Sequence, residues 1–149
     1  MPSENTLDGL PGGQAARDDA AGDHAAARAH LDGLWSRGTA FLGCPVAILG
    51  GAMSWVSERH LVAAISNAGG FGVIACGAME PDTLAAEIAG AQALTDRPFG
   101  VNLITMHPRL DALIRVCLEA RVGHIVLAGG IPPSGAVRAL HTAYGLDAA

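Results

Sequence analysis

Three short segments of the sequence carry residue types that could lie against a ligand or hydrogen-bond it. They are the glycine step at residues 50–51, Asn102 at the end of an apolar run, and the glycine step at residues 129–130. Glycine lets another group lie directly against the backbone, and a carboxamide can both donate and accept hydrogen bonds. A Gly-Gly step between apolar residues is also typical of a plain turn, so the first segment alone leaves both interpretations open.

These segments fall within a regular alternation of apolar runs and helical periodicity that begins at Pro45. The pattern predicts strands over residues 46–49, 71–75, 99–103 and 124–128, each followed by a helix. Ser57 is the predicted N-cap of the first of these helices, and Pro81 begins the second. Such βα units predict a parallel α/β sheet, either doubly wound or a (β/α)8 barrel, and both folds bind ligands at the carboxyl ends of their strands.

Residues 1–34 differ from the rest in composition and are predicted to be a disordered acidic extension rich in Ala and Gly. They hold six acids against two arginines and show no bulky apolar face. An Ala-rich piece over residues 15–31 could become helical, but isolated helices of this length are marginal in water. Residues 35–149 are predicted to form the α/β domain.

Charge and composition exclude several partners and chemistries. Beyond residue 34, eight acids balance seven arginines without a basic stripe, so we expect no nucleic acid partner. No run approaches the roughly 18 apolar residues of a membrane helix, and the first residues show neither a basic start nor an apolar signal core, so a cytoplasmic location without membrane contact is expected. Three cysteines without CxxC spacing suggest neither a disulfide framework nor a metal site, and the absence of lysine excludes Schiff-base chemistry.

Three linked motifs carry a family resemblance. They are Ile48-Leu49-Gly50-Gly51-Ala52-Met53-Ser54-Trp55-Val56-Ser57, then Leu61-Val62-Ala63-Ala64-Ile65-Ser66-Asn67-Ala68-Gly69-Gly70-Phe71-Gly72, then Leu94-Thr95-Asp96-Arg97-Pro98-Phe99-Gly100-Val101-Asn102-Leu103. In order and spacing they resemble the nitronate monooxygenase (2-nitropropane dioxygenase) family, which includes FMN-dependent enoyl-acyl-carrier-protein reductases. The resemblance implies a (β/α)8 TIM barrel with FMN at the carboxyl ends of the strands, here truncated to about the first four βα units.

The resemblance also assigns cofactor-binding residues by position. Gly51, Ala52 and Met53 match the family's first loop, whose backbone lies against the isoalloxazine ring. Asn102 matches a strand residue that hydrogen-bonds the flavin, and the alternative is that its amide satisfies backbone groups of a loop. The family's phosphate-binding glycine loops and its Gly-Gly-His motif have no counterpart in this sequence, so no catalytic residue is assigned. His107 is interpreted as a polar loop residue beside Pro108.

The function implied by the resemblance is FMN-dependent oxidation of nitronates, with a small molecule as substrate. Three alternatives remain: an FMN-dependent enoyl-acyl-carrier-protein reductase, a self-contained flavodoxin-like domain, and a non-catalytic half barrel. A half barrel would leave its first and fourth strands as unpaired edges, so self-association through these edges is a further expectation.

Overall fold

The computed structural model describes the backbone of residues 12–146, and their side chains from Asp23 onward. The chain divides into two compact units, one up to Arg37 and one from Gly38 onward. The elements in chain order are α1 (Gly12–Leu42), β1 (Leu49–Gly50), α2 (Arg59–Asn67), β2 (Phe71–Ala75), α3 (Pro81–Leu94), β3 (Phe99–Ile104), α4 (Leu110–Glu119), β4 (His124–Ala128) and α5 (Ser134–Ala143).

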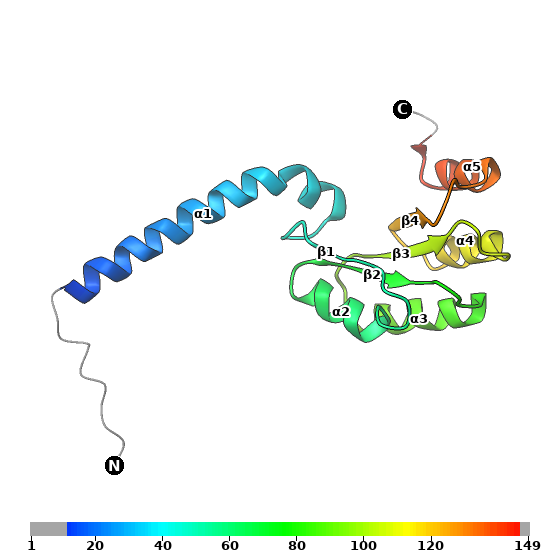
Figure 1. The fold of residues 1–149 in the computed structure, drawn as a ribbon, viewed down its shortest axis with the longest axis horizontal. Helices are drawn as coiled ribbons and strands as arrows, with labels where there is room; N and C mark the ends of the chain where they lie inside the picture. Colours follow the sequence, from blue (N-terminus) through cyan, green and yellow to red (C-terminus); the bar gives the residue numbers. More distant parts are fainter. Residues whose placement is uncertain (1–11, 147–149) are drawn as a thin grey trace, which may run out of the picture. The chain divides into compact units, whose positions relative to one another are not determined.

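The four strands form one parallel sheet in the order β1-β2-β3-β4 (Figure 1). Each strand is joined to the next by a helix, which is the connection that parallel neighbours require. The register pairs Ala75 of β2 with Asn102 of β3, and Asn102 with Val126 of β4. In the described part of the chain, β1 and β4 are therefore the two edge strands.

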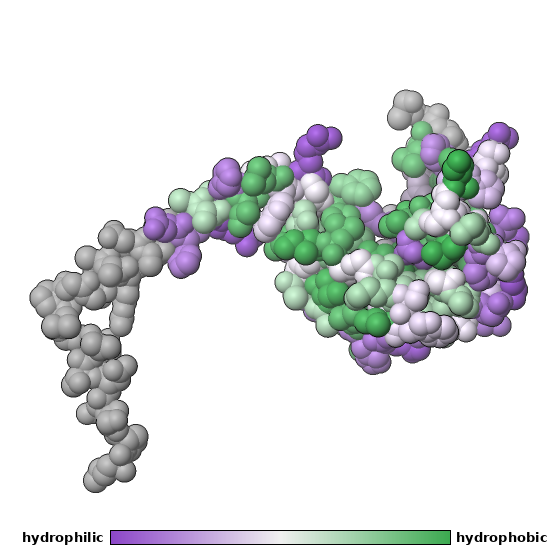
Figure 2. All heavy atoms as spheres, in the orientation of Figure 1, coloured by the Kyte–Doolittle hydropathy of each residue, from purple (hydrophilic) through white to green (hydrophobic). Residues whose placement is uncertain are grey.

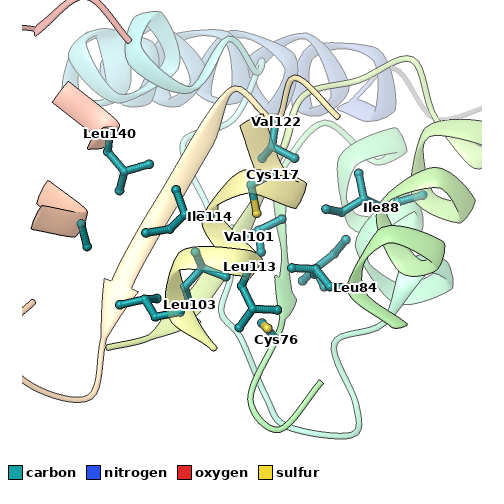
Figure 3. Close-up of a cluster of buried hydrophobic side chains, with 14 of the residues drawn as sticks. Cys76, Leu84, Ile88, Val101, Leu103, Leu113, Ile114, Cys117, Val122 and Leu140 are labelled. Carbon is teal, nitrogen blue, oxygen red and sulfur yellow. The ribbon is translucent and has the colours of Figure 1, made fainter. Parts of the chain in front are cut away.

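Helices α2, α3 and α4 lie along one face of this sheet (Figure 1). Val101 and Leu103 point from β3 into a core that also holds Leu84 and Ile88 of α3 and Leu113 of α4, all fully buried (Figure 3). Burying each such side chain contributes about 1.5–3 kcal/mol, so this layer is the main source of stability. Because side chains alternate along a strand, Gly100, Asn102 and Ile104 face the opposite side of β3, which we call the inner face.

Apolar side chains close the inner face at the amino ends of the strands. Phe71 of β2 packs with Leu42 and Cys44, and its ring meets that of His124 edge-on at 4.9 Å between centroids. Gly100 lies between them on β3, and a Cβ there would lie only 3.0 Å from the Phe71 ring. The missing side chain of Gly100 therefore lets the two rings meet across β3, and the carboxyl ends remain as the open side.

An ion pair joins α2 to α3 on the outside of the core. The Arg59 guanidinium donates to the Glu87 carboxylate at 2.7 Å, and the Arg59 backbone N–H donates to the same carboxylate at 2.9 Å. Burial alone would raise the pKa of Glu87, but the hydrogen bonds and charge of Arg59 outweigh this and hold that pKa below its ordinary value. Gly90 of α3 makes room for the pair, since a Cβ there would lie 2.6 Å from Cδ of Arg59.

Several predicted elements are confirmed and two need correction. Strands at residues 71–75 and 124–128 and the helix start at Pro81 agree with the structure, and β3 is one residue longer than predicted. The predicted strand over residues 46–49 is wrong in its bounds, because Ile48 N–H donates to Val46 O in a γ-turn and only Leu49–Gly50 pairs. The N-cap of α2 is Glu58, whose carboxylate accepts from the N–H groups of residues 60 and 61, and not Ser57.

The extension predicted over residues 1–34 falls partly outside the described residues, which begin at Gly12. From there the backbone is helical. The side chains of residues 23–34 are all exposed, and Arg28 pairs with Asp32 one turn away at 2.8 Å. The disorder of this extension stays a prediction.

Among residues 12–146 no helix is long and apolar enough to cross a membrane. The exposed surface is nevertheless uneven. Figure 2 shows hydrophobic residues gathered on the face that it presents around β1 and β4, with hydrophilic residues along the α4 side. Large exposed hydrophobic residues include Leu49 of β1 and Val126 of β4, which belong to the two edge strands.

Candidate functional site

The loop between β1 and α2 carries three of the four predicted cofactor residues, and Ser57 holds it in shape. The Ser57 hydroxyl donates to Gly51 O at 3.0 Å and accepts from the Met53 backbone N–H at 3.0 Å. Ser57 is 3% exposed, and its own carbonyl accepts from Ala75 N–H at the end of β2. One buried hydroxyl thus closes the loop on itself, and one backbone bond ties it to the neighbouring strand.

Within this loop, Gly51, Ala52 and Met53 are all exposed. A Cβ added to Gly51 would meet no atom within 4 Å, whereas one added to the preceding Gly50 would lie 2.3 Å from the Ile65 side chain of α2. Gly50 therefore serves helix packing and Gly51 faces open space. The two halves of the Gly-Gly step have different roles, and only the second is available to a ligand.

Asn102 lies on β3 with its backbone in the sheet and its side chain on the inner face. Its carbonyl accepts from Cys76 N–H at 3.1 Å. Among the described residues no hydrogen bond of its side-chain amide is found, and its assignment to a ligand stays a prediction. Its paired neighbours are Ala75 and Val126, which offer no polar group to the amide. The carboxamide is thus free to hydrogen-bond a ligand.

The structure places all four predicted residues toward the carboxyl ends of the strands, on two elements separated by β2. The β2 residue paired with Asn102 is Ala75, which has a small side chain. No bulky residue of β2 follows it before the Cys76–Gly77 turn. The amino ends of the same face are filled by Phe71, Leu42 and Cys44. A planar ligand on the loop and the Asn102 amide therefore belongs at the carboxyl side, as in parallel α/β proteins generally.

A cavity of about 210 Å³ lies beside the loop, between it and the turn that follows β2. Its walls include Trp55, Cys76, Gly77 and Met79. The Cys76 thiol is 1% exposed, and burial raises its pKa to about 11. This thiol is therefore protonated at neutral pH, which makes it a poor nucleophile.

A larger groove of about 540 Å³ runs along β4 and is lined mainly by apolar side chains, among them Phe71, Val126, Leu140 and Tyr144. It follows the free edge of the sheet, and its lining includes Val126, which pairs with Asn102, and Leu49, which precedes the Gly-Gly step. The Tyr144 hydroxyl, which lines it, donates to Val122 O. We interpret this groove as the uncovered flank of an edge strand and the carboxyl-end loops as the ligand site.

Two polar residues after β3 complete the description of this side. His107 accepts from the Arg109 backbone N–H at its Nδ1, at 3.1 Å, which agrees with a local role in the turn. The Thr105 hydroxyl is buried and has no partner among the described residues, and a Cβ on Gly130 would lie 3.3 Å from it. No group of three or more His, Cys, Asp or Glu residues suited to a metal ion occurs in the described part of the chain.

Sequence reasoning missed the role of Ser57 and the backbone conformation of Trp55. A serine before a helix signals an N-cap, and nothing in the sequence shows that its hydroxyl turns back to the loop while Glu58 caps α2. Trp55 has a backbone φ of 66°, which no sequence pattern predicts for tryptophan.

Comparison with known proteins places this geometry in context. Residues 36–143 match the sequence profile of the family described as nitronate monooxygenase. A (3aS,4S,5R,7aS)-5-hydroxy-7a-methyl-1-oxo-octahydro-1H-indene-4-carboxyl-CoA dehydrogenase from Mycobacterium tuberculosis is 39% identical over 95 residues, covering 64% of this chain and 26% of that protein. A nitronate monooxygenase from Paraburkholderia phytofirmans is 36% identical over 95 residues, covering 62% of this chain and 26% of its own length.

Among solved structures, FabK from Thermotoga maritima superimposes with a TM-score of 0.68 at 40% identity, covering 72% of this chain and 34% of the FabK chain. Such neighbours are TIM barrels, so the predicted fold class is confirmed, with four consecutive βα units present here. The chain spans about a quarter of the length of the curated relatives that it matches.

Proposed function

Because the chain belongs to the nitronate monooxygenase family, we propose that its unit from Gly38 onward forms part of the FMN site of an oxidoreductase. The observation that carries this proposal is the open space above Gly51, beside an inner face whose Asn102 amide has no other partner. A flat aromatic ring needs both features, since it must approach a backbone closely and hydrogen-bond along its polar edge. The residues present fit the ring of a flavin.

In this proposal each residue has a distinct task. The backbone of Gly51, Ala52 and Met53 supports the ring, Asn102 hydrogen-bonds its polar edge, and Ser57 keeps the supporting loop closed. FMN, when bound, supplies the capacity to accept and donate electrons, and the protein supplies position and electrostatics. The contribution of this chain is therefore to bind and orient.

We propose oxidation of alkyl nitronates as the family-type reaction, with a small organic molecule as substrate. Flavin-dependent reduction of enoyl thioesters is the second candidate, and the similarity to FabK favours it. Nitrite release from propane-2-nitronate and oxidation of NADPH by a crotonyl thioester distinguish the two reactions. A chain that performs neither reaction and binds no flavin would be the non-catalytic half barrel.

The test of the cofactor proposal uses two glycine variants. Gly51→Ala and Gly123→Ala each place a Cβ in open space, so neither should lower stability. Gly51→Ala should nevertheless weaken FMN binding at least tenfold, measured by quenching of flavin fluorescence, because the new methyl group occupies the place of the ring. Gly123→Ala should bind FMN like the unaltered chain. Equal FMN affinity in the two variants would contradict the assignment of Gly51.

Asn102→Ala provides a second, independent check. Loss of its amide should weaken FMN by about 1–3 kcal/mol, because the polar edge of the ring would lose its partner in a site shielded from water. Unchanged affinity would remove Asn102 from the proposed site and leave the loop assignment intact.

A further inference from the structure

Trp55 has a backbone conformation that its side chain disfavours. Val56 N–H donates to Met53 O at 3.0 Å, which makes residues 53–56 a turn with Trp55 at its third position. The φ of 66° at this position is the conformation that turns of type II reserve for glycine. Among the described residues, Arg121 is the other non-glycine residue with a positive φ, of 56°. It follows the end of α4, where such a conformation is common.

Packing in the core does not compensate for this strain. The Trp55 side chain is 87% exposed, although a tryptophan ring is among the largest apolar surfaces that a protein can bury. Strained residues persist where the surrounding structure enforces them, and they cluster at sites that hold ligands. An exposed indole held by a strained turn, two residues beyond the proposed flavin loop, is therefore an available binding surface.

Trp55 is one of the residues that line the 210 Å³ cavity described above. Opposite it, the turn after β2 contributes Ala78 and Met79, and the Ser54 hydroxyl lies 3.2 Å from where a Cβ of Gly77 would be, so the two loops touch. Complete ligand pockets usually measure about 300–1,000 Å³, so a cavity of this size accommodates one group of a larger molecule. Ser54, Glu80 and Thr83 also line the cavity, but most of its lining residues are apolar, which favours a hydrocarbon group.

Other loops at the carboxyl ends present similar side chains. Met106 after β3 is 76% exposed and Ile131 after β4 is 96% exposed. Glu80, which lines the cavity, forms an ion pair at 2.7 Å with Arg109 from the loop after β3. The described rim of the site is therefore apolar with a paired charge, which suits a substrate with a hydrocarbon portion better than a small anion alone.

We propose that Trp55 and this cavity form a subsite for the hydrocarbon portion of the substrate, an alkyl chain of several carbons or a fused ring. The proposal rests on the proposed function in placing the reacting group at the flavin loop, and it adds what the substrate carries beyond that group. A short nitronate leaves the subsite empty. A longer one covers the indole and removes it from water.

The probes are propane-1-nitronate and octane-1-nitronate, used below the concentrations at which they form micelles. Isothermal titration calorimetry of the full chain should give an affinity at least about tenfold higher for the octyl probe, because five additional methylene groups leave water. Trp35→Ala is the matched control, since Trp35 is the second tryptophan and lies on α1. It should keep the discrimination, while Trp55→Ala should reduce it to about twofold or less.

Trp55→Gly gives a further check on the same residue, because glycine relieves the backbone strain and the variant should be at least as stable as the unaltered chain. It should lose the discrimination as Trp55→Ala does. In Trp35→Phe, where Trp55 is the only tryptophan, emission should shift to shorter wavelength with the octyl probe and not with the propyl probe. Equal affinities for the two probes, no binding of either, or discrimination that survives in both Trp55 variants would overturn the proposal.

Flavin binding is measured separately on the same samples through the fluorescence of FMN. Discrimination that depends on Trp55 in a chain that does not bind FMN would support the subsite and contradict the cofactor assignment. FMN binding without any discrimination would support the cofactor assignment and overturn the subsite. The two failures are thus distinguishable.

Discussion

Ser57→Ala tests whether the proposed flavin loop depends on a single hydroxyl. The substitution removes the bond to Gly51 O and the bond from Met53 N–H, both 3.0 Å long. Each is worth roughly 0.5–1.5 kcal/mol net, and because Gly51 and Met53 are exposed, water can replace the lost partners. We therefore expect the closed conformation of the loop to lose about 1–2 kcal/mol of stability. This corresponds to a factor of about 5–30 in FMN affinity if the loop must close to bind.

Ser66→Ala is the matched control, since Ser66 also bridges two backbone groups. Its hydroxyl donates to Pro98 O at 3.0 Å and accepts from Gly72 N–H at 3.2 Å, in the core and away from the loop. Gly72 is buried, so an unsatisfied N–H there should cost about 1–3 kcal/mol or more of global stability.

The assay combines urea unfolding with an FMN titration of each variant under conditions where it is folded. Ser66→Ala should lower the unfolding midpoint more than Ser57→Ala and bind FMN with unchanged affinity. Ser57→Ala should lower the unfolding midpoint less than Ser66→Ala and should weaken FMN binding. FMN affinity that falls equally in both variants, or that does not fall in Ser57→Ala, would refute the idea that the loop is positioned by this hydroxyl.

Three further predictions concern the fold. Because the pKa of Glu87 is lowered in the folded state, its carboxylate stabilises the fold above the unfolded pKa of about 4.3, and this contribution is lost as the pH falls through the folded pKa. Glu87→Gln should therefore have a lower free energy of unfolding than the unaltered chain at pH 7 and the same free energy in acid. A difference in unfolding free energy that persists at pH 2 would contradict this. Gly72→Ala would place a Cβ 2.4 Å from Val62 O, so it should cost about 1–3 kcal/mol or more in thermal unfolding, and a neutral result would mean that α2 can move off β2. β4 has no proline, Asp, Glu, Lys or Arg to protect its edge, so the chain should elute as a dimer or larger in gel filtration. Val126→Lys, at a position that is 41% exposed, should elute as a monomer. If the variant elutes with the unaltered chain, pairing through this edge is contradicted.

The parts of the fold that the sequence predicted well are those decided by burial. The strands at residues 71–75 and 124–128 have their predicted bounds, and Pro81 begins α3, because apolar runs and a proline without an N–H leave few alternatives. β1 was predicted too long, because the run Val46–Leu49 is as apolar as a strand while its backbone makes a γ-turn. Apolar pattern alone does not reveal such a turn.

The candidate site was only partly predictable, for reasons of the same kind. Asn102 and Gly51 could be named from strand position and glycine content, but the different roles of Gly50 and Gly51 depend on where the Ile65 side chain of α2 lies. Trp55 could not be found at all, since turn propensities place glycine where this chain has its most exposed aromatic ring. Its conformation is visible only in three dimensions.

Gly90 and Arg59 depend on each other for space. A glycine inside α3 costs about 1 kcal/mol of helix propensity relative to alanine, and here it leaves room for the Arg59 side chain beside Glu87. Replacing Gly90 alone would favour the helix and would force the Arg59 side chain to shift beside Glu87. Related sequences should therefore vary these positions together, with larger residues at position 90 accompanied by shorter ones at position 59.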